Sequence, residues 1–201
     1  MNVKEKMDEW RGGRNWKSPI MINGFSRRHL IQQFNEFGFK RGAEIGVDRG
    51  RFSQFMCAEI PGLKLLCIDP WHWRFHGESR YESAKKRLKG YNSTLDRRTS
   101  IKAFEDVKDR SLDFIYIDGN HTFDFAMIDL IVWTQKVKYG GIVAGHDYYR
   151  FGKVGVIDAV DKYTEIHKID NWFITNHRKD KTPSFFWMRE KKHDWDRKIH
   201  E

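Results

Sequence analysis

The chain has 201 residues, which suits one ordinary domain, and 39% of the residues are hydrophobic and 15% aromatic. This composition supports a packed core and excludes a chain that is disordered throughout. No stretch approaches the roughly 18 uninterrupted apolar residues of a membrane span, and the start MNVKEKMDEW lacks the apolar core of a signal peptide. We therefore expect a soluble cytoplasmic protein without a membrane partner.

The formal net charge is +9, and the basic residues are concentrated in the N-terminal arm, in the segment from Arg80 to Lys102 and in the tail from Arg178. Such a pattern can attract nucleic acid or a phosphorylated small molecule, or it can be a solvated surface. Cys57 and Cys67 are the only cysteines and form no CxxC motif, which argues against a disulfide framework and a thiolate zinc site.

Short apolar runs alternate with longer patterns of helical periodicity, and this rhythm predicts an α/β layer fold. We expect a polar N-terminal arm over 1–25, a single domain over 26–190 and a charged tail over 191–201. Ser26 is the expected N-cap of the first helix, whose apolar pattern ends at Gly38.

The first half of the domain contains three expected strands and two further expected helices. The strands are GAEIGV at 42–47, which runs into a turn, KLLCID at 64–69 and TSIKAF at 99–104. The helices are RFSQFMCAEIPG at 51–62, which its Pro and Gly residues end, and the amphipathic ESAKKRLKGYN at 82–92.

The clearest strand is LDFIYID at 112–118, which is apolar until its final acid and is therefore expected to be covered on both faces. A helix follows from Phe123 through Val137 and is expected to close at Gly140 and Gly141. The remaining expected elements are a strand at 141–149, a helix at 156–163, and a hairpin-like pair of strands at 171–176 and 184–189 that closes the sheet edge.

Candidate functional residues stand where the expected strands end, because ligands of open α/β sheets bind at the carboxyl ends of the strands. These residues are Glu44, Asp69, Asp118, His146 and Asp147. Four of the five are carboxylates, so this edge of the sheet is expected to be acidic.

The stretch GAEIGVDRGRFS at 42–53 spaces its glycines differently from the G-x-G-x-x-G loop of dinucleotide-binding folds. Glu44 and Asp48 would also repel a pyrophosphate, which argues against a nicotinamide-dependent oxidoreductase. A ligand with a cationic centre, an ammonium group and a ribose diol suits these acids better, and S-adenosylmethionine has all three. Alternatively, Gly46 and Gly50 serve only a tight turn that needs positive φ.

Asp69 lies 25 residues after Glu44 in the sequence. An acid at about 20 residues from the glycine loop is placed to accept hydrogen bonds from a ribose diol, which either kind of cofactor carries. Together, these two acids favour a cofactor-binding loop over a plain turn.

Four stretches, AEIGVDRGRFS, LCIDPW, LDFIYIDGNHTFDFAMIDLIVW and GGIVAGHDYY, resemble the successive motifs of class I S-adenosylmethionine-dependent methyltransferases. They are most similar to the branch with an IDG-x-H signature that includes macrocin O-methyltransferase and cephalosporin hydroxylase-like proteins. The resemblance covers roughly residues 40–165. It implies a Rossmann-like, seven-stranded, mostly parallel sheet with helices on both faces and an antiparallel strand near the C-terminus.

The resemblance also implies S-adenosylmethionine as the cofactor. Glu44, Gly46 and Gly50 would surround its methionine part, Asp69 would bind its ribose, and Phe104 and Glu105 would lie near its adenine. The other cofactor-binding residues implied by motif position are Val47, Asp48, Trp71 and Asp118. For Trp71, packing in the core or at an interface is the alternative role.

Some members of the branch hold magnesium with an acid after the fourth strand and a pair of acids after the fifth. Asp118 and Asp147 match this pattern, whereas His146 stands where the first acid of the pair would be. Magnesium prefers oxygen ligands, and an imidazole suits manganese, iron or zinc better. A divalent metal at Asp118, His146 and Asp147 and a metal-free site are therefore both open.

His121 and Asp118 are the candidate catalytic residues. The His121 imidazole could remove the hydroxyl proton of the acceptor during methyl transfer, and helix capping or a hydrogen bond to Asp118 is the alternative. The predicted function is O-methylation of a small polar acceptor, with acidic or sugar-containing molecules among the candidates. The alternatives are a nucleic-acid-binding or nucleic-acid-modifying protein and an inactive cofactor-binding domain, and nothing in the sequence specifies an oligomeric state.

Overall fold

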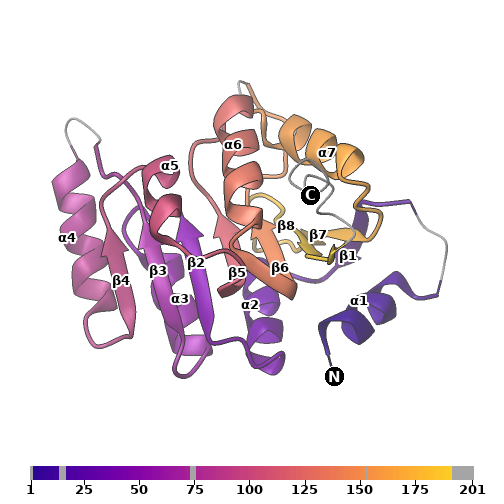
Figure 1. Cartoon of the computed structure of the whole chain (residues 1–201), viewed down its shortest axis with the longest axis horizontal. Coiled ribbons are helices and arrows are strands. Elements are labelled where there is room, and N and C mark those ends of the chain that lie inside the picture. The colour runs from indigo at the N-terminus through magenta and orange to yellow at the C-terminus, as the bar shows by residue number, and fades with distance from the viewer. Residues whose placement is uncertain (1, 14–16, 73–75, 153, 192–201) are drawn as a thin grey trace, which may run out of the picture.

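A computed structural model describes residues 2–13, 17–72, 76–152 and 154–191 of the chain (Figure 1). These residues form three layers, in which helices cover both faces of a central sheet (Figure 1). The charged tail predicted for 191–201 lies outside the described residues from 192 onward.

In the described part of the chain, the sheet has eight strands in the order β1-β7-β8-β6-β5-β2-β3-β4. The strands are β1 (Ile20–Asn23), β2 (Arg41–Ile45), β3 (Lys64–Ile68), β4 (Ser93–Asp96), β5 (Leu112–Ile117), β6 (Val137–Gly145), β7 (Trp172–Asn176) and β8 (Phe185–Met188). All neighbouring strands are parallel except β8, which is antiparallel to both β6 and β7. This arrangement confirms the predicted α/β class with an antiparallel strand near the C-terminus.

Two hydrophobic clusters show which helices cover which face of the sheet. Alternate residues of β5 point to opposite clusters, with Phe114 and Tyr116 in one and Ile115 and Ile117 in the other. The first cluster contains residues of α1 (Val3–Arg11), α2 (Arg27–Glu36), α3 (Arg51–Glu59) and α4 (Gly77–Leu88). The second contains residues of α5 (Ser100–Ala103), α6 (Phe123–Thr134) and α7 (Val156–Ile166).

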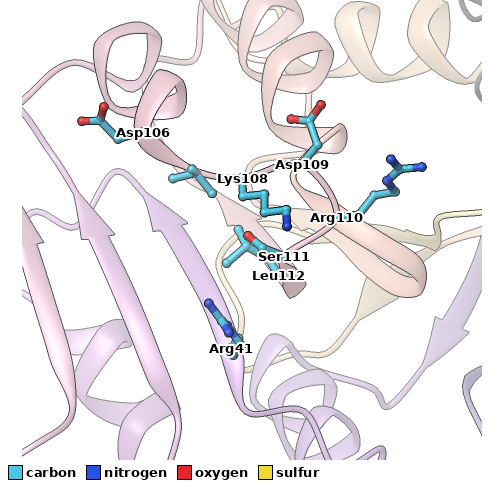
Figure 2. Close-up of a pocket in the computed structure, with 8 residues that line it drawn as sticks. Arg41, Asp106, Lys108, Asp109, Arg110, Ser111 and Leu112 are labelled. Carbon is cyan, nitrogen blue, oxygen red and sulfur yellow. The ribbon is translucent and has the colours of Figure 1, made fainter.

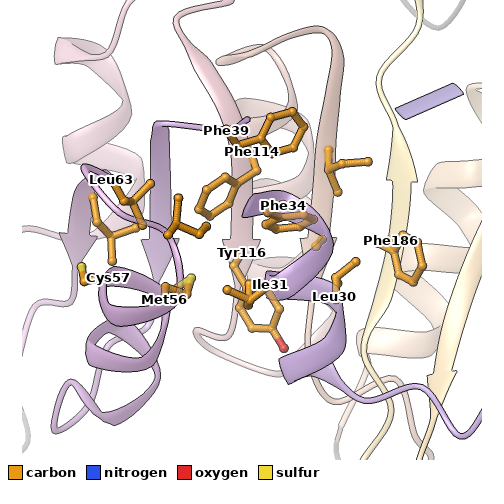
Figure 3. Close-up of a cluster of buried hydrophobic side chains, with 14 of the residues drawn as sticks. Leu30, Ile31, Phe34, Phe39, Met56, Cys57, Leu63, Phe114, Tyr116 and Phe186 are labelled. Atoms are coloured by element: carbon orange, nitrogen blue, oxygen red, sulfur yellow. The ribbon is translucent and has the colours of Figure 1, made fainter. Parts of the chain in front are cut away.

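Aromatic packing at the centre of the first cluster fixes α2 against the sheet (Figure 3). The ring centroids of Phe34, from α2, and Phe114, from β5, are 4.8 Å apart. Gly42 of β2 leaves room for this ring, because a Cβ at position 42 would lie 2.2 Å from a ring atom of Phe114. The strand that leads into the glycine loop is therefore anchored in the core.

The prediction of a strand at 99–104 is wrong, because these residues form α5 and lead into the 3-10 helix η1 (Phe104–Asp106). The strand that pairs with β3 is β4, which follows α4 after a short turn. As an edge strand, β4 is only half-buried and carries one large apolar residue, Leu95, so its sequence gives a weak strand signal.

The N-terminal arm, for which the sequence analysis predicted no helix or strand, contains α1 and β1. Asn2 and Glu5 form a capping box at the start of α1, whose Val3 and Met7 are buried. β1 pairs in parallel with β7 at the end of the sheet. This strand raises the count from the expected seven to eight, and it means that β1, rather than the pair of β7 and β8, forms this edge.

The helix predicted from Phe123 ends at Thr134, and Val137 begins β6. Gly140 and Gly141 lie within that strand, near a shift of the register between β5 and β6. The predicted antiparallel pairing of the last two strands, β7 and β8, is confirmed. No helix in the described ranges is long and apolar enough to cross a lipid bilayer.

Candidate functional site

The glycine loop connects β2 to α3 at the carboxyl edge of the sheet. Gly46 has φ +90°, and a Cβ there would lie 2.0 Å from the backbone carbonyl oxygen of Asp118. Gly50 has φ +71° and is the N-cap of α3, where a Cβ would lie 2.9 Å from the Cα of Ala84. Both glycines are therefore required by positive φ and by close approach of neighbouring backbone.

The carboxylate of Asp69, directly after β3, holds this loop in place. Its Oδ2 accepts hydrogen bonds from the backbone N–H groups of Val47, at 3.0 Å, and Asp48, at 2.9 Å. Its Oδ1 accepts a third from the N–H of Trp71 at 2.8 Å. A carboxylate has about four acceptor positions, so Asp69 keeps little capacity beyond this role.

Trp71 stabilises the loop and does not present an exposed ring face for stacking. Its side chain is buried, and its Nε1 donates a hydrogen bond of 2.7 Å to the backbone carbonyl of Asp48. The ring packs edge-on against Tyr81 of α4, with centroids 5.1 Å apart. Arg80 forms an ion pair with the Asp48 carboxylate, which ties the tip of the loop to the same helix.

Glu44 projects from β2 toward the layer of α2 and α3, where it is buried. The hydroxyl of Ser53, in the first turn of α3, donates a short hydrogen bond to its carboxyl group. Burial raises the pKa of Glu44 to about 8, although the hydrogen bond from Ser53 opposes the shift. The carboxyl group is therefore mainly protonated at neutral pH.

The structure does not bring Phe104 and Glu105 to the other predicted cofactor residues. Both belong to η1, and the Phe104 ring lies 4.9 Å from Nζ of Lys136. Lys136 directly precedes β6, so this contact lies toward the amino ends of the strands. The chain has already turned away from the carboxyl edge because α5 replaces the predicted strand.

A cluster of acids and histidines follows β5 and β6 at the carboxyl edge. The Nε2 of His121 lies 3.6 Å from Asp118 Oδ1 and 3.0 Å from Asp147 Oδ2. Within the described residues, this buried nitrogen makes no hydrogen bond of normal geometry. Asp147 itself has φ +56°, a conformation that orients its carboxylate at the end of β6.

His146 stands on the other side of the same acids. Its Nδ1 lies 3.1 Å from Asp147 Oδ1 and 3.7 Å from Asp118 Oδ1. The hydroxyl of Thr182, in the loop before β8, donates a hydrogen bond of 2.6 Å to Asp147 Oδ1 and lies 3.2 Å from His146 Nε2. Thr182 thus fixes the acid and the imidazole relative to each other.

The charges in this cluster are mutually stabilising. Burial would raise the pKa of Asp118, yet its contacts with His121 and His146 lower it to about 2. Burial would lower the pKa of His146, but Asp118 and Asp147 raise it to about 9. The pKa of His121 is raised chiefly by its interaction with Asp118. The acids are therefore ionised at neutral pH, and His146 retains a proton.

Asp118, His121 and Asp147 can each offer one ligand atom, and these atoms all lie within 4.8 Å of one another. A donor set of two carboxylates and one imidazole fits manganese, iron or zinc better than magnesium. The third member of this group is His121, whereas His146 was the predicted third ligand. His146 instead lies beside Asp147, where it can orient the carboxylate.

Arg27, in the first turn of α2, was not among the predicted site residues. Its Nη1 lies 3.8 Å from Asp118 Oδ2, and its guanidinium lies 4.6 Å from the centroid of the Phe52 ring. Ser53 and Thr182 were also missed. All three contact the predicted acids through the tertiary fold, and the only local signal was a basic residue at a helix N-terminus, where cations are unfavourable.

The interior behind the two histidines is closed. A crevice of about 10 Å³ reaches from His121 and His146 to an apolar floor that includes Leu130, Val156 and Val160. This volume is at the lower limit of about 10 to 15 Å³ that one water molecule needs. A ligand of the cluster therefore approaches from the loop side rather than from the core.

Several solved methyltransferase structures share this fold. An O-methyltransferase from Bacillus cereus in complex with SAH has a TM-score of 0.64 and 12% identity, covering 93% of this chain and 90% of that chain. TomG, an O-methyltransferase from Streptomyces achromogenes involved in tomaymycin synthesis and solved with SAM, has a TM-score of 0.62 and 14% identity, covering 94% and 89%. A putative caffeoyl-CoA O-methyltransferase from Staphylococcus aureus has a TM-score of 0.58 and 19% identity, covering 93% and 99%. The fold is therefore the Rossmann-like fold of these enzymes.

A family model described as a methyltransferase domain matches residues 43–148, which are 106 of the 201 residues. The chain therefore belongs to this methyltransferase domain family, and the match together with the fold confirms the class I methyltransferase assignment predicted from the sequence. The uncharacterized protein y4gI of Sinorhizobium fredii is 28% identical over 133 residues, 63% of this chain, and the matched part is 14% of that relative. Membership of the IDG-x-H branch stays a prediction.

Proposed function

We propose that this protein is an S-adenosylmethionine-dependent methyltransferase that transfers the methyl group to a hydroxyl oxygen of a small polar acceptor. The observation that carries the proposal is the glycine loop, which Asp69 and the backbone of Asp118 hold beside the acidic carboxyl edge of the sheet. A methyltransferase domain that covers residues 43–148 contains all of these elements.

The residues around the loop suit the chemistry of the cofactor. The backbone at Gly46 and the Asp118 carboxylate would face the cationic methionine part, and the last acceptor position of Asp69 would bind a ribose hydroxyl. When bound, S-adenosylmethionine supplies an electrophilic methyl group on sulfur. The chain's contribution at this edge is to hold that group in line with the acceptor and to exclude water.

The acceptor is proposed to lie over the cluster of Asp118, His121 and Asp147. As the new carbon–oxygen bond forms, the carbon–sulfur bond breaks, and the hydroxyl proton must leave the acceptor. His121 Nε2 is the proposed proton acceptor, since its nitrogen is the buried member of the cluster without a hydrogen bond. The carboxylates raise the pKa of His121, so neutral imidazole, and with it the transfer rate, should increase toward alkaline pH.

As an alternative to His121 as the base, we also propose that Asp118, His121 and Asp147 can hold a divalent transition metal. The His121 imidazole would then be a ligand of the metal and would not accept the proton. A bound metal ion would supply Lewis acidity that favours the ionised form of the acceptor hydroxyl. His146 and Thr182, which both contact Asp147 Oδ1, would then hold this carboxylate in position.

The branch with the IDG-x-H signature is the proposed subfamily, because Ile117, Asp118, Gly119 and His121 occupy its motif positions. The placement of Asp118 and His121 on one cluster gives that motif a shared role. Acidic and sugar-containing hydroxyl compounds are the first acceptors to test.

The test is to incubate the protein with S-adenosylmethionine and a panel of hydroxyl-bearing acceptors, with and without Mn²⁺, and to measure S-adenosylhomocysteine by mass spectrometry. We expect acceptor-dependent product from the wild type and a loss of about a hundredfold or more in His121→Gln, within the range of general-base contributions. The variant should bind S-adenosylhomocysteine with unchanged affinity. Equal turnover by both proteins would contradict the role of His121.

A further inference from the structure

A second hollow lies at the amino ends of the strands, on the edge of the sheet opposite the glycine loop (Figure 2). It has a volume of about 500 Å³ and is lined by Arg41, the first residue of β2, and by residues 106–112, which lead into β5. Because β2 runs from Arg41 to the glycine loop, the full length of the strand separates this hollow from the proposed methyl-transfer site. We call it the amino-edge groove.

The acids of the amino-edge groove form ion pairs with residues that do not line the groove. The Asp106 carboxylate accepts a charged hydrogen bond of 2.6 Å from Arg98, and Asp109 pairs with Lys136 at 2.8 Å. In Figure 2 both carboxylates point away from Ser111. The charge of Asp109 is therefore offset by Lys136, and that of Asp106 is offset in part, because Arg98 also pairs with Asp96.

The cations of the groove are not neutralised in the same way. Within the described ranges, no carboxylate lies at ion-pair distance from Arg41, Lys108 or Arg110. In Figure 2 the ammonium of Lys108 and the guanidinium of Arg41 point toward the space beside the Ser111 hydroxyl. Like charges that converge on one hollow repel each other unless an anion lies between them.

Arg110 adds a third positive charge at the rim. Its backbone has φ +56°, the left-handed region that costs a residue with a side chain on the order of 1 kcal/mol. The guanidinium lies 5.6 Å from the ring centroid of Tyr139, which holds it beside the groove without neutralising it. The turn thus keeps Lys108 on the groove and Arg110 at its rim, where the Arg110 guanidinium points away from Ser111 in Figure 2.

We propose that the amino-edge groove binds the phosphate group of a small phosphorylated molecule. Arg41 offers a forked pair of N–H donors, Lys108 a compact positive charge and Ser111 a hydroxyl, and together they match the several oxygens and double charge of a phosphate. The groove volume of about 500 Å³ lies within the range of roughly 300 to 1,000 Å³ that is usual for small-molecule sites. The site is independent of the proposed methyl transfer.

The test is calorimetric titration of the full chain with inorganic pyrophosphate at low and moderate salt. The double variant Arg41→Ala/Lys108→Ala should lose about tenfold or more in affinity, because two charged donors are removed. Both side chains are exposed, so the variant should fold, which its circular dichroism and melting temperature would verify. The matched control is Lys86→Ala/Lys89→Ala, which removes the same charge from exposed positions at the end of α4 and should leave the affinity unchanged.

Three outcomes would overturn the proposal. The first is no binding of pyrophosphate, and the second is an equal loss of affinity in both double variants, which would indicate attraction by net charge alone. The third is binding of a single-stranded oligonucleotide at this groove when pyrophosphate does not bind, which would point to nucleic acid instead. Unchanged affinity of Arg41→Ala/Lys108→Ala for S-adenosylhomocysteine is expected and would confirm that the two edges are separate.

Discussion

Replacing Glu44 with Gln should make the stability of the protein less dependent on pH. Glu44 is only 1% exposed, and burial raises its pKa from 4.5 to about 8. The folded chain therefore holds a proton on this group that the unfolded chain releases above about pH 4.5. In the wild type, the associated stability is present below the unfolded pKa and is lost as pH rises through the folded pKa of about 8.

The size of this pH effect on the free energy of unfolding follows from the pKa shift of Glu44. Each pKa unit corresponds to about 1.4 kcal/mol, so the cost of keeping Glu44 in the fold should grow by on the order of 4 kcal/mol between about pH 5 and pH 9. The amide of the Glu44→Gln variant would be neutral at both values and could still accept the hydrogen bond from Ser53. The stability of Glu44→Gln relative to the wild type should therefore increase with pH.

The assay is urea unfolding of the wild type and Glu44→Gln at both pH values, followed by circular dichroism. Other groups titrate in both proteins, so the difference between the two free energies of unfolding is the quantity to compare. Glu36→Gln, at an exposed carboxylate of α2, is the control and should show no such trend. If the difference between Glu44→Gln and the wild type is the same at both pH values, Glu44 is not the buried neutral acid described above.

Three further predictions concern the loop and the acid cluster. Gly46→Ala should lower the free energy of unfolding by about 3 kcal/mol or more, because its Cβ would lie 2.0 Å from the Asp118 carbonyl oxygen. The control Gly62→Ala, with φ +75° but no atom within 4 Å of the new Cβ, should lower the free energy of unfolding by only about 1 kcal/mol. Thermal denaturation compares the two variants, and equal losses of stability would contradict the close approach at Gly46. Asp69→Asn should weaken S-adenosylhomocysteine binding by about tenfold or more in calorimetry, because an amide cannot accept all three loop N–H groups, and an unchanged affinity would remove Asp69 from the site. Asp147→Asn should weaken Mn²⁺ binding by at least about tenfold, whereas Asp158→Asn on α7 should not, and equal affinities in a competition titration would exclude the proposed metal ligands.

The sequence was sufficient for elements with strong periodicity. The helix capped by Ser26 and the apolar strand that ends before Asp118 were both predicted, because each buries a face or both faces in the core. The edge strand β4 and the strand β1 were not predicted, since each is short and half-exposed. At such positions, pairing with a neighbouring strand outweighs the local pattern.

Some features of the candidate site were likewise predictable from the sequence, and others were not. Asp69 and Asp118 were recognisable because acids that end strands stand out in the sequence. The partners of these acids were not, because Arg27 reaches Asp118 and Thr182 reaches Asp147 only through the packing of distant segments. A local sequence pattern shows which face of an element is buried, and it carries no information about the side chain that meets that face.

The most direct test of the central claim is calorimetric titration of the metal-stripped protein with S-adenosylhomocysteine, repeated with added Mn²⁺. We predict one binding site of roughly micromolar affinity, with S-adenosylhomocysteine displaced by S-adenosylmethionine. Absence of binding by a protein that circular dichroism shows to be folded, with and without the metal, would contradict the account. The glycine loop would then be a turn that Asp69 holds for the fold alone.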